Sequence, residues 1–157
     1  MDAYGIGGVF FGWGVAVAVF SVFLAPVLQT RFGAVRVLTG TLLVLMLDLI
    51  GLGLAAGHSV PAVVVLVIVS GALLGINNTI YTELAMGVSD SPRPVASAGY
   101  NFVRWMGGAL APFAAARLGE HFGPQIPFFA AALAMVAAIG IVFGGRNYLK
   151  SHEPHVV

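Results

Sequence analysis

Five long apolar stretches dominate this sequence and limit the folds open to it. They lie at about residues 8–30, 37–57, 60–88, 95–116 and 126–145. A membrane-spanning helix needs about 20 mostly apolar residues. A transmembrane β-barrel would instead show apolar and polar residues in alternation. We therefore expect an all-α membrane protein, with one transmembrane domain over residues 1–145 built as a bundle of five transmembrane helices, and a cytoplasmic tail over 146–157.

The scarcity of charge supports the same fold class. Only 8% of the residues are charged, whereas an ordinary soluble domain has about 25%. This composition argues against a disordered chain and a nucleic-acid binder, and it makes the lipid bilayer the expected surrounding. The absence of cysteine excludes thiolate metal sites and disulfides. We expect no metal and no cofactor.

The few basic residues predict an orientation in the membrane. Short cytoplasmic loops carry an excess of Lys and Arg. One side of the predicted bundle holds five bases and the other holds Arg117; the five are Arg31, Arg36, Arg93, Arg146 and Lys150. We expect the C-terminus in the cytoplasm and the N-terminus outside.

A pattern at the end of the first stretch recurs 86 residues later. Leu24-Ala25-Pro26 with Arg31-Phe32-Gly33 is matched by Leu110-Ala111-Pro112 with Arg117-Leu118-Gly119. The two copies would lie on opposite sides of the membrane, as in the inverted repeats of secondary transporters. The repeating unit would be three helices long, and the counterpart of the 60–88 helix would precede residue 1. The sequence thus predicts a chain that lacks an N-terminal part.

Two stretches carry a resemblance to a known family. The first resembles the cytoplasmic loop motif G-x-L-A-D-R-x-G-R-R/K of the major facilitator superfamily. Leu28, Arg31 and Gly33 match it, and Arg36 supplies a trailing base, whereas Pro26, Gln29 and Thr30 replace the motif's Gly, Ala and Asp. The second, Arg93 to Leu110, resembles the eleventh helix of drug-efflux members, with a loop base, a Val-Ala-Ser entry, Arg104 and a Gly-Gly pair in that order.

The resemblance implies a role as well as a fold. The five helices would match helices 8–12 of the family's twelve, a partial C-terminal half of the fold. The activity implied is secondary active transport: proton-coupled export of small, amphipathic molecules by alternating access, as an antiporter in a bacterial plasma (inner) membrane. Its partners would be a small-molecule substrate, which the sequence does not identify, and the missing N-terminal transporter half.

Polar side chains inside the apolar stretches are the candidate functional residues, because such residues are costly in lipid. Asp48 lies near the middle of the second stretch. It is either a functional acid that takes up and releases a proton or a structural acid capped by a neighbouring helix. The third stretch is polar around much of its circumference near its end. We expect Asn77, Asn78 and Tyr81 to line a cavity there.

Arg104 in the fourth stretch needs an acidic or carbonyl partner at membrane depth. We expect it to pair with Glu83 on the preceding antiparallel helix, helped by Tyr100 or Asn101, as a cytoplasmic gate or a structural clamp. The candidates for transport or proton coupling are thus Asp48, Glu83 and Arg104. The cavity-lining candidates are Asn77, Asn78, Tyr81 and Asn101, and the loop-motif residues are Arg31, Gly33 and Arg36.

The sequence contains no recognisable catalytic motif, such as G-x-S-x-G, H-E-x-x-H or a phosphate-binding loop. We therefore expect no enzyme. Three alternatives to a transporter stay open: a non-transporting fragment of one, a self-associating five-helix exporter or channel for small metabolites, and a membrane assembly or scaffold protein.

Overall fold

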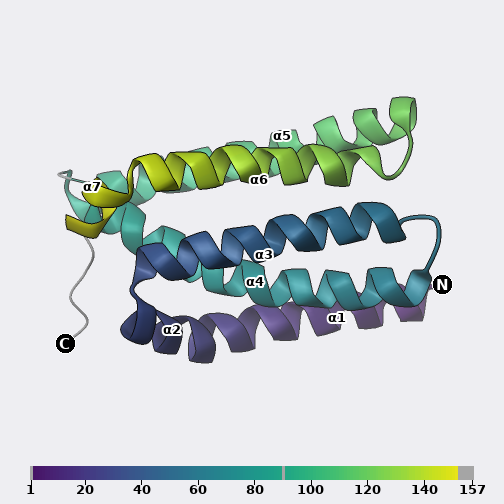
Figure 1. Cartoon of the computed structure of the whole chain (residues 1–157), viewed down its shortest axis with the longest axis horizontal. Helices are drawn as coiled ribbons and strands as arrows, with labels where there is room; N and C mark the ends of the chain where they lie inside the picture. Colours follow the sequence, from purple (N-terminus) through teal and green to yellow (C-terminus); the bar gives the residue numbers. More distant parts are fainter. Residues whose placement is uncertain (1, 90, 152–157) are drawn as a thin grey trace.

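A computed structural model describes residues 2–89 and 91–151, and almost all of these residues are helical. The elements are α1 Ala3–Val19, the π-helix η1 Phe20–Leu24, α2 Ala25–Phe32, α3 Ala34–Ala55, α4 Val60–Gly87, α5 Arg93–Phe122, α6 Ile126–Gly144 and α7 Arg146–Ser151. No strand occurs within the described ranges. The long helices run along the long axis of the molecule and are joined by short connections (Figure 1).

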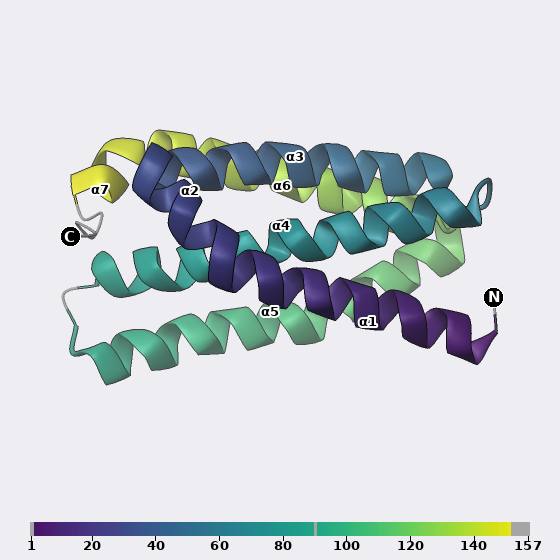
Figure 2. The same cartoon turned by 90° about the horizontal axis from the view of Figure 1, so that it is seen from below.

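The elements α1, η1 and α2 form one continuous helical rod that bends before Pro26. Proline has no N–H and its ring collides with the carbonyl four residues earlier. The wider π turn accommodates the ring, and the N–H of Ala25 bonds to the carbonyl oxygen of Phe20, five residues back. Figure 2 shows the rod changing direction between α1 and α2. The bend brings α2 across the end of α4.

Glycines with a positive φ lie in the tight turns that reverse the chain, among them Gly57 between α3 and α4, with a φ of 83°. Gly33 ends α2 with a φ of 82°, and Gly123 ends α5 with a φ of 105°. Residues with a Cβ rarely adopt these angles. The sequence repeat aligns Gly33 with Gly119, but α5 continues through Gly119 as far as Phe122. In the second copy of the repeat, the chain therefore reverses at Gly123, one helical turn after the position that the repeat predicts.

The middle of the bundle is α3, which packs against α6 on one side and α4 on the other, while α4 also packs against α1. Leu38 and Leu42 of α3 meet Ile76 and Ile80 of α4 in the central apolar cluster. In lipid, such contacts stabilise a bundle through van der Waals packing rather than through removal of surface from water. Among its described residues α5 has none that is buried.

Glycines of α4 allow α1 to approach closely. A Cβ on Gly71 would lie 2.7 Å from the carbonyl oxygen of Trp13, and a Cβ on Gly75 would overlap the carbonyl oxygen of Val17. Small residues four apart on one helix face are a common means of close helix packing in membranes. Gly71 and Gly75 thus lie at the close contact between α1 and α4.

Four helical segments are long and apolar enough to cross a membrane: Ala3–Phe32, Ala34–Ala55, Val60–Gly87 and Ile126–Gly144. The sequence predicted five. The fifth expected span, 95–116, falls within α5, which is a helix of 30 residues. It is less apolar than the other four because Asn101, Arg104 and several glycines interrupt it. Within the described residues the count of candidate spans by length and composition is therefore four.

The basic residues that predicted the orientation gather at one end of the bundle. Arg31 is in the last turn of α2, Arg36 in the first turn of α3, and Arg93 and Arg146 begin α5 and α7. Figure 1 shows all of these helix ends at the same end of the molecule. Arg117 lies near the far end of α5. Of the expected tail, α7 covers Arg146–Ser151, and residues 152–157 lie outside the described range.

Candidate substrate cavity

A cavity of about 470 Å³ lies between α1, α4 and α5. Its lining combines apolar and aromatic side chains with amides, phenols and one guanidinium, and consists of Trp13, Val17, Leu74, Asn77, Asn78, Tyr81, Tyr100, Val103 and Arg104. Small-molecule sites are typically of this size, mostly apolar, with a few polar groups that fix orientation. Three residues that the sequence predicts to line a cavity, Asn77, Asn78 and Tyr81, are thus brought together here.

Asn77 links this cavity to the centre of the bundle. The side chain is almost completely buried, with 1% of its surface exposed. The hydroxyl of Thr41 on α3 bonds to its Oδ1 atom, whereas Nδ2 has no hydrogen-bond partner. Buried polar groups are normally hydrogen-bonded. One end of the amide is therefore held by α3, and the other retains hydrogen-bonding capacity beside the cavity.

A contact between Thr82 and Tyr100 shows the register between α4 and α5. The Thr82 hydroxyl lies 3.4 Å from the Tyr100 phenol oxygen, and it also donates to the carbonyl oxygen of Asn78 at 2.9 Å. In a pair of antiparallel helices, moving toward the C-terminus of one helix corresponds to moving toward the N-terminus of the other. Residues that follow Tyr100 in α5 therefore lie level with residues that precede Thr82 in α4.

This register overturns the predicted Glu83–Arg104 pair. Arg104 lies level with Asn78, and Asn78 is five residues from Glu83, about 7.5 Å along the helix. Glu83 and Arg104 form no ion pair with each other, and neither of them forms one with any other described residue. The guanidinium of Arg104 lies 6.0 Å from the ring centre of its neighbour Trp105, and it lines the cavity. Asn101 is also absent from the lining, and its amide donates to Ser97 at 3.3 Å.

Glu83 is bonded instead to Gln29. The Nε2 atom of Gln29 donates to Oε2 of Glu83 at 2.8 Å, joining α2 to α4. Both residues lie toward the end of the bundle where the basic residues gather. Gln29 is not among the residues predicted from the sequence, because it falls at a position of the loop motif. Ala25 and Gln29, four residues apart, are both buried on one face of α2, and this burial orients Gln29 toward Glu83 of α4.

The loop motif lies around this contact. Gly33 adopts the positive φ that explains a glycine at this position of the motif. The Thr30 hydroxyl donates to the carbonyl oxygen of Val27 in its own helix, at 3.0 Å. Arg31 and Arg36 are exposed. The side-chain hydrogen bond between this segment and α4 is therefore made by Gln29. It is not made by Thr30, which stands at the position where the family's loop motif has Asp.

Asp48 is buried away from the cavity between α1, α4 and α5. Its side chain is 5% exposed, and neither carboxylate oxygen has a hydrogen-bond partner. It shares a face of α3 with Thr41, two helical turns earlier. No group of three or more His, Cys, Asp or Glu that could hold a metal occurs among the described residues. Asp48 is thus an isolated acid at the centre of the bundle.

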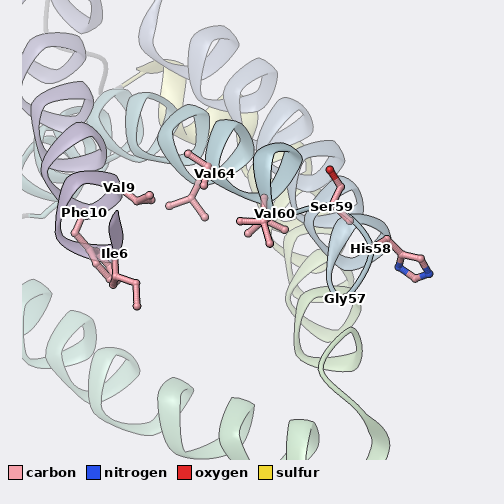
Figure 3. Close-up of a pocket in the computed structure, with 11 residues that line it drawn as sticks. Ile6, Val9, Phe10, Gly57, His58, Ser59, Val60 and Val64 are labelled. Atoms are coloured by element: carbon pink, nitrogen blue, oxygen red, sulfur yellow. The ribbon is translucent and has the colours of Figure 1, made fainter. Parts of the chain in front are cut away.

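A second cavity of about 470 Å³ lies at the opposite end from the basic residues. Ile6, Val9 and Phe10 of α1 face Val60 and Val64 of α4 across it (Figure 3). The ring of His58 points away from these apolar side chains in Figure 3. The side chains that face one another across this cavity are apolar. The polar residues of its lining are His58 and Ser59, and the Ser59 hydroxyl accepts a hydrogen bond from the N–H of Ala62. The lining is thus less polar than that of the cavity between α1, α4 and α5.

Comparison with known proteins gives one informative similarity. No family model matches the chain, and no solved structure matches it. The chain is 36% identical over 149 residues to the multidrug efflux protein YfmO of Bacillus subtilis (strain 168). The match covers 95% of this chain but 37% of the relative, so the chain spans little more than a third of the relative's length. The similarity and the four apolar helices fit an integral membrane protein of the transporter class.

Proposed function

We propose that this chain forms part of the second half of a secondary active transporter of the major facilitator kind, which exports small amphipathic molecules in exchange for protons. The observation that carries the proposal is the cavity between α1, α4 and α5. It brings amides, phenols and an arginine together in one cavity of a bundle whose core is mostly apolar. Polar groups at membrane depth are costly and mark substrate or ion pathways. The similarity to a multidrug efflux protein supports the same class of activity.

The exposed face of α5 supports a two-half arrangement. This helix has no buried residue within the described chain, and its large apolar side chains are exposed, among them Phe102, Val103, Trp105, Leu110 and Phe113. The cavity itself lies against α5 and α1. We propose that a first half packs on this side and closes the cavity, and that the halves rock about it so that it opens to one side of the membrane at a time.

The orientation we propose places the basic end of the bundle in the cytoplasm. Cytoplasmic loops are enriched in Arg and Lys, and the bases of α2, α3, α5 and α7 gather at that end. The membrane would be a bacterial plasma membrane. The Gln29–Glu83 bond then lies toward the cytoplasmic end, and the cavity one to two helical turns deeper.

Of the three candidates for coupling, we propose Asp48 as the residue that carries the proton. Its carboxylate is buried with no hydrogen-bond partner, so a proton can enter or leave without breaking an existing contact. Glu83 is engaged by Gln29. Arg104 lines the cavity, where we assign it to the substrate.

The proposal is tested by a chimera. The 149-residue segment of the Bacillus subtilis relative that this chain matches is replaced by the chain, and proton-gradient-driven dye efflux is measured in cells. We expect the chimera to export dye. Asn78→Leu should reduce efflux at least tenfold, because it removes a polar group from the cavity. The control is Asn101→Leu, the same change on an amide outside the cavity, which should keep most activity. Equal effects of the two variants would contradict the assignment of this cavity.

A further inference from the structure

We infer that the cavity between α1, α4 and α5 binds the acidic group of an amphipathic anion on Arg104. The inference rests on the proposed function and adds the charge of the substrate to it. The molecules expected are lipophilic monoanions: an aromatic or aliphatic body carrying one carboxylate, sulfonate or phosphate ester.

The charge of the lining favours an anion. Arg104 is the one cationic side chain among the residues that line the cavity, and none of them is acidic. Its guanidinium contacts the ring of Trp105 and has no acidic partner in the described part of the chain. An intramembrane arginine is costly unless it has a partner or water. A bound anion supplies that partner.

The acids of the bundle are placed so that they do not compete. Glu83 accepts a hydrogen bond from Gln29 and lies about 7.5 Å along α4 from the level of Arg104. Asp48 is buried on α3 and is not part of the lining. Among the described residues that line this cavity, a cationic ligand would meet the guanidinium and no carboxylate. The arrangement therefore discriminates against cations by repulsion as well as by the lack of a partner.

The rest of the lining fits the body of such a ligand. Trp13, Val17 and Val103 supply apolar contact, and the phenols of Tyr81 and Tyr100 can donate hydrogen bonds near the charged end. A guanidinium presents two parallel N–H donors that match the two oxygens of a carboxylate. Lysine carries the same charge without that fork. The geometry thus predicts sensitivity to both the charge and the shape of the side chain at position 104.

The test uses the purified chain in nanodiscs of zwitterionic lipid and two probes of matched shape, 1-pyrenebutyrate and 1-pyrenebutylammonium. The chain has two tryptophans, so a Trp105→Phe background leaves Trp13, in the cavity wall, as the donor of energy transfer to pyrene. Empty nanodiscs correct for partition into lipid. We expect the anion to bind at least ten times more tightly than the cation.

Variants separate a ligand contact from a structural role. Arg104→Gln should weaken binding of the anion at least tenfold without weakening that of the cation, and Arg104→Lys should keep part of the preference. Arg117→Gln removes an arginine of the same helix that contacts Phe113 and does not line the cavity, so both probes should bind it as they bind the parent. If the Arg104→Gln variant does not insert into the membrane, the Arg104→Lys variant still measures the loss of the paired N–H donors of the guanidinium.

Three results would overturn the inference: equal or tighter binding of the cation, an anion affinity that Arg104→Gln leaves unchanged, or an equal loss of both probes. Dye efflux by the chimera keeps this inference separate from the proposed function. Efflux without a preference for anions rejects the inference alone. Binding of the anion to the chain, with no efflux by the chimera, rejects the proposed function alone.

Discussion

The polar residues of the bundle differ in what surrounds them, and this difference separates their roles. Asn78 and Arg104 face a cavity, Glu83 is hydrogen-bonded across a helix interface, and Asp48 is buried without a partner. Burial of a polar group without a hydrogen bond costs free energy. A residue kept in that state is therefore a candidate for a function that uses its protonation.

The first prediction concerns Asp48→Asn. The substitution keeps the shape of the side chain and removes the exchangeable proton. In the chimera we expect insertion to be normal and the dependence of dye efflux on the proton gradient to be lost. The measurement is the efflux rate with and without an uncoupler. Gradient-driven efflux that survives the substitution would show Asp48 to be a structural acid.

The second prediction concerns the close contact of α1 and α4. Gly75→Ala places a Cβ against the carbonyl oxygen of Val17, and overpacking of this kind costs about 1–3 kcal/mol. We expect the free energy of unfolding to fall by that amount in a denaturant titration in micelles. Gly40→Ala is the matched control, because a Cβ there meets nothing within 4 Å and alanine favours the helix by about 0.5–1 kcal/mol. Equal stabilisation by both alanines would show that α1 and α4 do not meet at Gly75.

At the scale of the elements, the bond between Gln29 and Glu83 joins the segment after the π turn to the end of α4. The bend at Pro26 directs α2 across the bundle, and a second contact precedes it, where Ser21 and Thr79 lie with their hydroxyl oxygens 3.1 Å apart. Both contacts tie the first helical rod to α4. In contrast, α5 packs loosely against α4 and α6 and has no buried residue among those described.

The third prediction is a double-mutant cycle on this link. Gln29→Ala and Glu83→Ala should each destabilise the bundle, and the double variant should lose less than their sum. The coupling expected is about 1–2 kcal/mol, between the values for hydrogen bonds to charged groups and those measured in membrane bundles. Thr30→Ala, which removes a hydroxyl bonded within its own helix, should show no coupling to Glu83. Additive losses for Gln29 and Glu83 would contradict the link.

Much of the element pattern could be predicted from sequence, because a long apolar run in a membrane protein has few alternatives to a helix. Asn77, Asn78 and Tyr81 could be placed at a cavity because polarity around a helix excludes it from lipid. The register of α4 against α5 could not be predicted from the sequence, because counting residues from the ends of apolar runs does not locate the contact of Thr82 with Tyr100. That error paired Arg104 with Glu83 and hid the role of Gln29.

At the scale of the whole molecule, α3 packs between α6 and α4, and α1 packs against α4. Figure 2 shows α1 and α5 on the side of α4 away from α3. The large apolar side chains of α5 are exposed. The cavity is lined on one side by this poorly covered helix. A bundle built this way needs a further surface against α5 to enclose a substrate. We therefore expect transport from two halves together and none from this chain alone.

The measurement that tests this claim most directly is the rate of proton-gradient-driven dye efflux from cells that express either the chain alone or the chimera, at equal amounts of inserted protein. We predict efflux at the rate of empty cells for the chain alone and at least tenfold faster efflux for the chimera. Gradient-driven efflux by the chain alone would contradict the account and favour a self-associating exporter.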